Sequence, residues 1–207
     1  MTDLLDGARA LGLDLDDTQL AQLTRHLDLM DEWGERMNLT AIRERSQQLT
    51  RHVLDSLSVA PWLRGRRVAD VGSGAGFPGI PLAIARPDLQ FALIESTGKK
   101  CRFLEHVRDT LGLANVEVVQ SRAEAHATRE RFDTVLARAV GPLADLVRYA
   151  GALVAGGGRL LAMKGRYPGD ELAKKLNGWK VVGVHPLRVP GLDEERHLVE
   201  LARSHEK

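Results

Sequence analysis

The fold of this chain is decided by residues 67–81, Arg67-Val-Ala-Asp-Val-Gly-Ser-Gly-Ala-Gly-Phe-Pro-Gly-Ile-Pro81. Val68, Ala69 and Val71 form a short apolar run with β-branched members, which predicts a buried strand. Glycines crowd the exit of this strand, and a helix is expected over 79–86 because proline is tolerated in a first helical turn. Since glycine has no Cβ, a ligand can lie against the bare backbone, and the helix-start amides favour a polar or anionic group.

A second strand supports a ligand site at this turn. Phe91-Ala-Leu-Ile94 is apolar and ends in Glu95. A carboxylate at the end of the next strand, about 20 residues after the glycine turn, can accept hydrogen bonds from two ribose hydroxyls. Strand, glycine turn, helix, strand and acid together predict a site for a nucleoside cofactor.

The glycine spacing fits two kinds of cofactor. Gly74-Ala-Gly76-Phe-Pro-Gly79 matches the dinucleotide pattern G-x-G-x-x-G, which is weak evidence by itself. The stricter pattern, an acid followed by alternating glycines at Asp70, Gly72, Gly74 and Gly76, resembles the first motif of methyltransferases that use S-adenosyl-L-methionine (SAM). A glycine turn without a ligand is the plain structural alternative, and the downstream acid argues against it.

Composition limits the class of protein. A chain of 207 residues with 43% hydrophobic residues fits one ordinary domain with an extension. The net charge of +1 gives no bulk basicity that would indicate nucleic acid. The charge is uneven, however, because acids dominate residues 1–36 and arginines dominate residues 43–67. We therefore expect a local basic surface beside an acidic helical face.

The single cysteine, Cys101, excludes an intramolecular disulfide and a cysteine-based zinc site. It lies between Lys100 and Arg102 in an expected helix, where a buried structural cysteine is the favoured interpretation. The chain opens without a signal-peptide pattern and contains no apolar run of about 18 residues. These observations predict a cytoplasmic protein with no membrane contact and no metal.

Residues 1–64 are expected to form a helical extension packed on the domain of residues 65–207. Helices are predicted over 2–12, from Asp16 or Asp17 to about Met37, and over 47–62 with Ser46 as the cap; residues 38–42 form a connector. In the third helix Arg51 and Asp55 stand one turn apart, as do His52 and Ser56. From spacing alone these four are ordinary helix-surface residues.

The rest of the chain alternates strands and helices. Strands are predicted over 67–71, 90–95, 116–119, 133–137, 159–163, 180–185 and 197–202, and helices over 79–86, 97–111, 142–154 and 169–177, with Gly156-Gly-Gly158 as a turn into the fifth strand. Five strands separated by helices predict right-handed βαβ units and a parallel sheet. The segment 186–195 has no helical period, so the last two strands should form an antiparallel hairpin at the sheet edge. This pattern predicts an α/β fold resembling the class I SAM-dependent, Rossmann-like methyltransferases, with a seven-stranded sheet.

Methyl transfer from SAM mostly requires that donor and acceptor are held in line. The sequence after the fourth strand, Ala137-Arg138-Ala139-Val140, lacks the Asn/Asp-Pro-Pro-aromatic turn used for adenine amines. Cys101 is misplaced for a pyrimidine C5 nucleophile. An acceptor with its own free lone pair, such as guanine N7, needs no general base. Strand ends are where ligands bind in open α/β sheets, which points to Gly72, Glu95, the segment 121–124, Arg138 and Lys164.

Several stretches together resemble the RsmG family, also called GidB, of small-subunit ribosomal RNA guanine-N7 methyltransferases. They are Asn38-Leu-Thr-Ala-Ile42, Arg51-His-Val-Leu-Asp-Ser-Leu57 and the glycine loop from Asp70 to Ala83, with Glu95-Ser96, Lys99-Lys100, Phe103-Leu104, Arg138-Ala139, Lys164-Gly165, Val189-Pro-Gly-Leu-Asp193 and Arg196-His197. The tail Phe77-Pro-Gly-Ile-Pro81 is the most specific piece, because generic SAM loops lack it.

The resemblance implies a class I fold, SAM as donor, and methylation of N7 of one guanine in the decoding-centre loop of 16S rRNA, position 527 in the usual RNA numbering. It implies SAM contacts at Gly72, Phe77, Ala123, Glu124 and Arg138; Gly74 and Gly76 belong to the same loop, and Glu95 is added from the strand-end argument. It further implies a target pocket formed by Asn38, Arg51, His52, Asp55, Lys164 and Arg196. No side chain is expected to act as a base, so catalysis rests on positioning, with Arg138 and Lys164 as candidates. The small ribosomal subunit is the expected partner, and the chain is expected to be a monomer.

Three other functions remain open from the sequence. A SAM methyltransferase for a small molecule or protein is mildly disfavoured by the arginines of 43–67. A short-chain oxidoreductase would need Tyr-x-x-x-Lys, and neither Tyr149 nor Tyr167 has lysine four residues on. A cofactor-binding module without catalysis would bind SAM without turnover.

Overall fold

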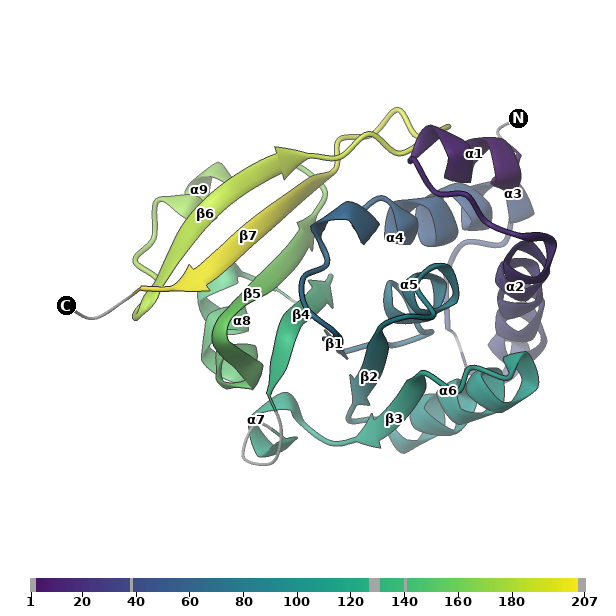
Figure 1. The fold of residues 1–207 in the computed structure, drawn as a ribbon, viewed down its shortest axis with the longest axis horizontal. Helices are drawn as coiled ribbons and strands as arrows, with labels where there is room; N and C mark the ends of the chain where they lie inside the picture. The colour runs from purple at the N-terminus through teal and green to yellow at the C-terminus, as the bar shows by residue number, and fades with distance from the viewer. Residues whose placement is uncertain (1–2, 38, 127–130, 140, 205–207) are drawn as a thin grey trace.

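A seven-stranded sheet with the strand order β3-β2-β1-β4-β5-β7-β6 forms the centre of the computed structural model (Figure 1), which describes residues 3–37, 39–126, 131–139 and 141–204. The strands are β1 Arg67–Val71, β2 Gln90–Glu95, β3 Val116–Gln120, β4 Phe132–Arg138, β5 Val154–Lys164, β6 Trp179–Pro186 and β7 His197–Arg203. β1 to β5 pair in parallel, whereas β7 is antiparallel to both β5 and β6. The predicted parallel sheet with a C-terminal antiparallel hairpin is thus confirmed.

Helices cover both faces of this sheet. They are α1 Leu4–Ala10, α2 Asp17–Met37, α3 Arg45–Gln48, the π-helix η1 Leu49–Leu54, α4 Asp55–Leu57, η2 Ala60–Trp62, α5 Gly79–Ala85, α6 Gly98–Leu111, α7 Ala123–His126, α8 Leu143–Ala150, η3 Gly151–Leu153 and α9 Gly169–Leu172. Successive residues of a strand face opposite sides, so β1 sends Val68 into one core and Ala69 and Val71 into the other. The N-terminal helices, α5 and α6 share the first core, whereas α8 packs in the second.

The long helix α2 begins at a reciprocal cap. The Gln19 amide nitrogen donates to Asp16 Oδ1 over 2.8 Å, and the Asp16 amide nitrogen donates to Gln19 Oε1 over 3.0 Å. This exchange satisfies helix-start amides that have no partner inside the helix. Leu23 and Met30 are fully buried, so the apolar stripe read from the sequence packs on the sheet domain.

Three details of the expected elements were wrong. The predicted helix 47–62 is instead a series of short segments, α3, η1, α4 and η2; α3 starts at Arg45, with Glu44 at the cap position and Ser46 inside the helix. The predicted helix 169–177 has only one turn, α9. The triple glycine 156–158 lies within β5 as a bulge, since the β4–β5 register shifts there. Gly157 in this bulge has a φ of 79°, a backbone conformation that glycine adopts at little cost.

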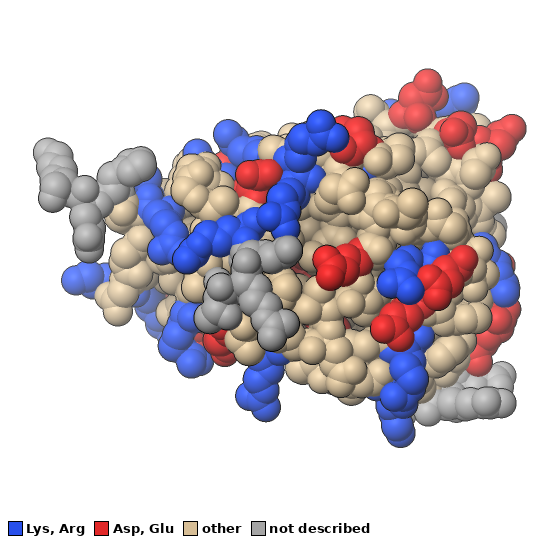
Figure 2. All heavy atoms as spheres, turned by 60° about the horizontal axis from the view of Figure 1, so that its bottom comes forward, with Lys and Arg blue, Asp and Glu red and all other residues tan. Residues whose placement is uncertain are grey.

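The expected single basic surface over 43–67 does not form. Arg66 and Arg67 stand at the amino end of β1, where their backbone amides donate to Asp133 Oδ2, whereas Arg51 lies near the carboxyl ends of the strands. Arg45 pairs with Asp28 of α2. Figure 2 shows that Lys and Arg gather mainly on the side of the molecule that carries the C-terminal strands, and acids mainly on the side of the N-terminal helices.

Within the described residues, no helix is both long and apolar enough to cross a membrane. Among these same residues, no cluster of three or more His, Cys, Asp or Glu side chains could hold a metal ion.

Candidate functional site

The glycine loop after β1 requires glycine for two different reasons. Gly72, Gly74 and Gly76 have φ values of 71°, 58° and 89°, in the left-handed region that side chains disfavour. Gly79 is required for space, because a Cβ there would lie 2.3 Å from Leu93 Cδ2. The Gly79 amide donates to Asp70 Oδ2 over 2.9 Å and so ties the start of α5 to β1. The loop therefore presents exposed backbone at Gly72, directly after the carboxyl end of β1.

Glu95 holds this loop from the next strand. Its Oε2 accepts the Gly74 amide at 3.1 Å, and its Oε1 accepts the Thr97 amide at 2.8 Å, in a side chain that is only 5% exposed. Each carboxylate oxygen keeps a second lone pair. The Glu95 carboxylate can thus accept two ribose hydroxyls while it fixes the loop, which fits the expected nucleoside cofactor.

Phe77 lies between two imidazoles. Its ring stacks on His26 of α2 at a centroid distance of 4.6 Å and on His52 of η1 at 4.8 Å. The Arg138 guanidinium carbon stands 5.4 Å from the same ring. Burial lowers the pKa of His26 to about 4 and that of His52 to about 4, so both rings are neutral at physiological pH. The N-terminal helices therefore clamp the Phe77 end of the glycine loop.

His26 was not identified from the sequence as part of the site. Its Nε2 lies 2.9 Å from the Ala75 carbonyl oxygen, and its ring is fully buried. A signal was available, since His26 stands three residues after Leu23 and four before Met30, on the apolar stripe of α2. A polar side chain on a buried helix face needs a hydrogen-bond partner, and here the partner is the glycine loop.

Asp70 is a buried acid at the end of β1. Burial raises its pKa to about 7, although the hydrogen bond from Gly79 and the charge of Arg138 lower it in part. Its Oδ1 has no hydrogen-bond partner among the described residues. The acid of the motif thus anchors the loop through one oxygen.

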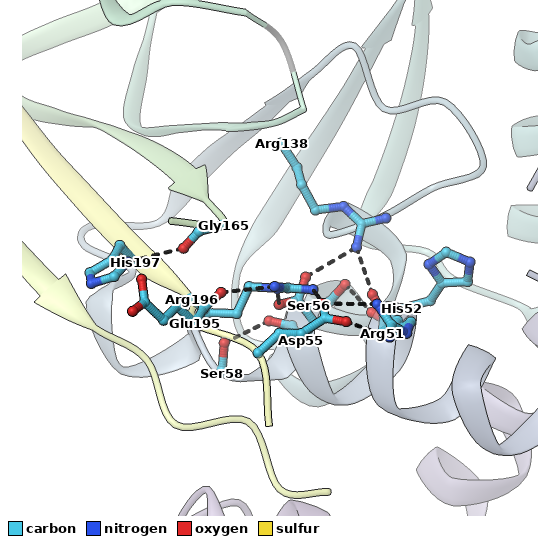
Figure 3. A network of polar contacts seen from close by, with 11 residues as sticks. Arg51, His52, Asp55, Ser56, Ser58, Arg138, Gly165, Glu195, Arg196 and His197 are labelled. Atoms are coloured by element: carbon cyan, nitrogen blue, oxygen red, sulfur yellow. Dashed lines mark hydrogen bonds and ion pairs between the residues drawn. The ribbon is translucent and has the colours of Figure 1, made fainter. Parts of the chain in front are cut away.

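A second acid, Asp55, joins three separate segments (Figure 3). The Asp55 Oδ2 accepts from Arg138 Nη1 at 3.2 Å, and its Oδ1 accepts from Arg196 Nε at 3.0 Å. Arg138 Nη1 also donates to the Arg51 carbonyl oxygen at 3.1 Å. Asp55 is 3% exposed, and burial raises its pKa, while the two guanidinium groups lower it and offset only part of that effect.

This geometry corrects the surface interpretation of the third helix. Asp55 and Ser56 are buried, and the Ser56 hydroxyl donates to the His52 carbonyl. Arg51 does form ion pairs at the surface, but with Glu194, at 2.6 and 2.9 Å, rather than with Asp55.

A cavity of about 750 Å³ opens beside this network, at the carboxyl ends of β4 and β5. Its lining includes the five described residues that were expected to form the target pocket, Arg51, His52, Asp55, Lys164 and Arg196. Asn38, the sixth, lies outside the described residues. Ala137, Leu146, Ala162 and Met163 give the cavity an apolar wall. An apolar wall with convergent polar groups is typical of a pocket for a small ligand group.

Lys164 is held in place by neighbours. Its Nζ donates to the Gly141 carbonyl at 2.7 Å and pairs with Glu171 at 2.8 Å. The carboxylates of the cavity, Asp55 and Glu171, therefore each face a cation, and His52 is neutral with its Nε2 2.9 Å from Thr40 Oγ1. Among the described lining residues, this arrangement favours positioning of an acceptor over proton removal.

The expected cofactor residues line the neighbouring strand ends. Ala123 and Glu124 start the short helix α7; Ala123 is buried and Glu124 is exposed. Arg138 belongs to both groups, since it touches Phe77 of the glycine loop and lines the cavity. Cys101 is buried, as expected, and its thiol donates to the Glu95 carbonyl at 3.2 Å. The cofactor and acceptor sides thus meet at Arg138.

The strand order, the glycine loop, Glu95 at the end of β2 and the adjacent acceptor cavity define a class I SAM-dependent methyltransferase. Solved structures agree on the fold. A glycopeptide N-methyltransferase, MtfA, solved with S-adenosyl-L-homocysteine, has a TM-score of 0.60 at 14% identity over 74% of this chain and 87% of its own. Fibrillarin from Aeropyrum pernix, solved with SAM, has a TM-score of 0.52 at 17% identity over 69% of this chain and 68% of its own.

Sequence comparison identifies the family. The family model described as GidB, rRNA small subunit methyltransferase G, matches residues 19–199. Ribosomal RNA small subunit methyltransferase G from Marinobacter nauticus is 46% identical over 97% of this chain and 94% of its own length. The protein of the same name from Nitrosospira multiformis is 47% identical over 98% of this chain and 97% of its own. The chain belongs to the rRNA small subunit methyltransferase G family.

Proposed function

We propose that this chain transfers a methyl group from SAM to N7 of a single guanine, position 527 in the usual numbering, in the decoding-centre loop of 16S rRNA. The observation that carries the proposal is the gathering of Arg51, His52, Asp55, Lys164 and Arg196 around one cavity beside the glycine loop. Arg51, His52 and Asp55 come from η1 and α4, whereas Lys164 ends β5 and Arg196 precedes β7, so three distant segments meet at this cavity.

The cofactor side fits SAM by the arrangement of its polar and backbone groups. Glu95 accepts the ribose hydroxyls, the loop of Gly72, Gly74 and Gly76 lies against the nucleoside, and Ala123 and Glu124 border the base. Arg138 and Phe77 lie where the glycine loop meets the acceptor cavity. SAM supplies a methyl group already activated by a sulfonium, so the protein needs to orient rather than to activate the donor.

The acceptor side fits guanine N7 because its described residues offer cationic side chains and no free general base. N7 carries a free lone pair in the plane of the ring, so its attack on a methyl group releases no proton at that atom. The described carboxylates of the cavity are paired with cations and its histidine is neutral, which suits a reaction without a general base. Arg51, Lys164 and Arg196 are placed to neutralise phosphates or to contact the guanine O6.

The substrate in this proposal is the small ribosomal subunit or its RNA. A target base in RNA is reached from a single-stranded loop, where it can leave the stack. We further propose that the chain acts as a monomer in the cytoplasm.

Transfer of tritium from labelled SAM to small subunits that lack their own modification tests this function. Label recovered as 7-methylguanosine at one site of the decoding-centre loop is the expected result after nuclease mapping. Label at a different base, or no label on RNA by a chain that binds SAM, would overturn the proposed acceptor.

A further inference from the structure

The acidic turn before β7 stands beside the cationic groups of the target cavity. Asp193, Glu194 and Glu195 follow one another and are exposed. Acids at the mouth of a site for a polyanion oppose binding by simple repulsion. The contacts of these acids with the arginines of the cavity therefore bear on how the site binds its substrate.

Glu194 binds both arginines of the cavity mouth. Its two carboxylate oxygens accept from the Arg51 guanidinium at 2.6 and 2.9 Å, in a two-pronged arrangement. Its Oε2 also accepts from Arg196 Nη2 at 3.3 Å. Two guanidinium groups converging on one pair of oxygens is the arrangement that arginines also use for phosphate.

Exposure separates Glu194 from the other acid that binds Arg196. The Asp55 side chain is 5% exposed and holds Arg138 and Arg196 from inside, whereas the Glu194 side chain is 50% exposed. Ion pairs at the surface contribute little to stability, so an incoming anion can replace the Glu194 carboxylate. Asp55 therefore fixes Arg196 from the buried side, whereas Glu194 binds Arg196 and Arg51 from the exposed side and can be exchanged for another anion.

Two side cavities around Glu194 adjoin the target cavity through shared lining residues, and we call the three together the trough. A cavity of about 460 Å³, lined by Ser46, Gln47, Thr50, Arg51, Gly191, Leu192, Asp193 and Glu194, shares Arg51 with the target cavity. Another of about 490 Å³, lined by Gly165, Arg166, Glu194, Glu195 and Arg196, shares Gly165 and Arg196 with the target cavity. Glu194 lines both of these side cavities. A strand laid across both side cavities would therefore contact Glu194.

We infer that the trough takes a single RNA strand, with the target base in the central cavity, and that the Glu194 carboxylate occupies the subsite of a backbone phosphate next to that base. This inference rests on the proposed function. Glu194 then sets specificity, because an RNA gains the two arginines only when it seats well enough to displace the carboxylate. Non-cognate RNA meets an acidic turn and neutralised arginines instead.

Removal of the Glu194 charge tests the inference. In Glu194→Gln the arginines lose their anionic partner, so a fluorescent oligouridine should bind roughly three- to tenfold tighter at low salt. Asp193→Asn is the matched control, since it removes the same charge one residue away, and it should change this affinity less than about twofold. Adding Arg51→Ala to Glu194→Gln should abolish the gain.

A second readout reports specificity. The ratio of the affinity for unmodified small subunits to the affinity for oligouridine should fall in Glu194→Gln but not in Asp193→Asn. Equal affinities of Glu194→Gln and the parent for oligouridine, or equal gains in both variants, would overturn the phosphate subsite. Methyl transfer by the parent chain is assayed alongside: if it methylates RNA, such a result removes only this inference, whereas an inactive parent removes the proposed function.

Discussion

Glu95 shows how one side chain can serve structure and ligand together. It spends one lone pair of each oxygen on the backbone amides of Gly74 and Thr97. The remaining lone pairs face the edge of the glycine loop where the ribose is proposed to lie. Its effect on SAM binding should therefore be larger than that of any exposed acid on a neighbouring strand.

Glu95→Ala should weaken SAM binding roughly 10- to 100-fold, because it removes a charged acceptor and frees the loop that it holds. Isothermal calorimetry with SAM measures the change directly. Glu117→Ala, an exposed acid opposite Ala92 on β3, is the control and should bind SAM as the parent does. Unchanged affinity in Glu95→Ala would remove Glu95 from the cofactor site.

For Arg196, on the acceptor side, we expect the opposite pattern to that of Glu95. Because it lies between Asp55 and Glu194, and not against the glycine loop, Arg196→Ala should spare SAM affinity while it lowers methyl transfer to RNA at least roughly tenfold. Calorimetry and tritium transfer on the same preparation separate the two effects. Equal losses in both assays would instead place Arg196 in the cofactor site.

At the scale of elements, the π-helix η1 explains why spacing misled the sequence interpretation. An ordinary helix places residues four apart on one face, which would pair Arg51 with Asp55. A π-helix closes its hydrogen bonds five residues apart, so the same residues diverge. Arg51 then reaches Glu194 at the surface, and Asp55 turns inward to Arg138. No local sequence signal announces this change of helix type.

The stack of α2, the glycine loop and η1 has a pH dependence whose sign follows from its histidines. The folded protein keeps the pKa of His26 at about 4, below the ordinary value of 6.5, so the unfolded chain binds more protons between these values. The stability that the folded protein has while His26 is neutral in both states is present above pH 6.5 and is lost as the pH falls toward 4. His52 acts in the same direction, and the raised pKa of Asp70 acts in the opposite direction.

A variant isolates the His26 contribution from these others. In His26→Gln, the loss of unfolding free energy between pH 6.5 and pH 4 should be smaller than in the parent by roughly 2–3 kcal/mol. Urea unfolding at a series of pH values measures it. His106→Gln, which removes an exposed imidazole from α6, should keep the parent's profile. Parallel profiles for His26→Gln and the parent would contradict a neutral buried ring.

At the scale of the whole molecule, the sheet could be predicted from local sequence patterns, whereas the trough could not. Apolar runs and glycine turns mark each strand locally, and the lack of a helical period after Pro186 marks the hairpin. The meeting of Arg51, Arg138 and Arg196 around Asp55 depends on contacts between segments up to 141 residues apart. Such contacts follow from packing. The strand-end argument pointed to Arg138 beforehand, but only the family resemblance pointed to Arg51, Asp55 and Arg196 as site residues.

The end of the N-terminal extension is held to the C-terminal strands of the sheet. Trp62 stacks on His185 of β6 at 3.8 Å, and Glu200 of β7 pairs with Arg64 at 3.1 Å. The N-terminal helices share one buried cluster with β1, β2, α5 and α6. We therefore propose that residues 1–64 are a structural part of one unit with residues 65–207, and not a separable domain.

A fragment of residues 65–207 should therefore fail to fold cooperatively, because it exposes the apolar surfaces of α5 and α6 against which α2 and α4 pack. Loss of near-ultraviolet circular dichroism and of a sharp thermal transition in the fragment would show this. The full chain, as reference, should melt in one transition. A fragment that melts sharply and binds SAM would contradict the proposal.

The buried thiol of Cys101 makes the protein convenient for site-directed spectroscopy. Because this lone sulfhydryl lies on the buried face of α6 and binds the Glu95 carbonyl, maleimide dyes should leave it unmodified in the native state. An Asp193→Cys variant would then carry a single reactive thiol on the turn beside Glu194, without any background mutation. The fluorescence of a dye at that position would follow the turn in real time as RNA enters the trough.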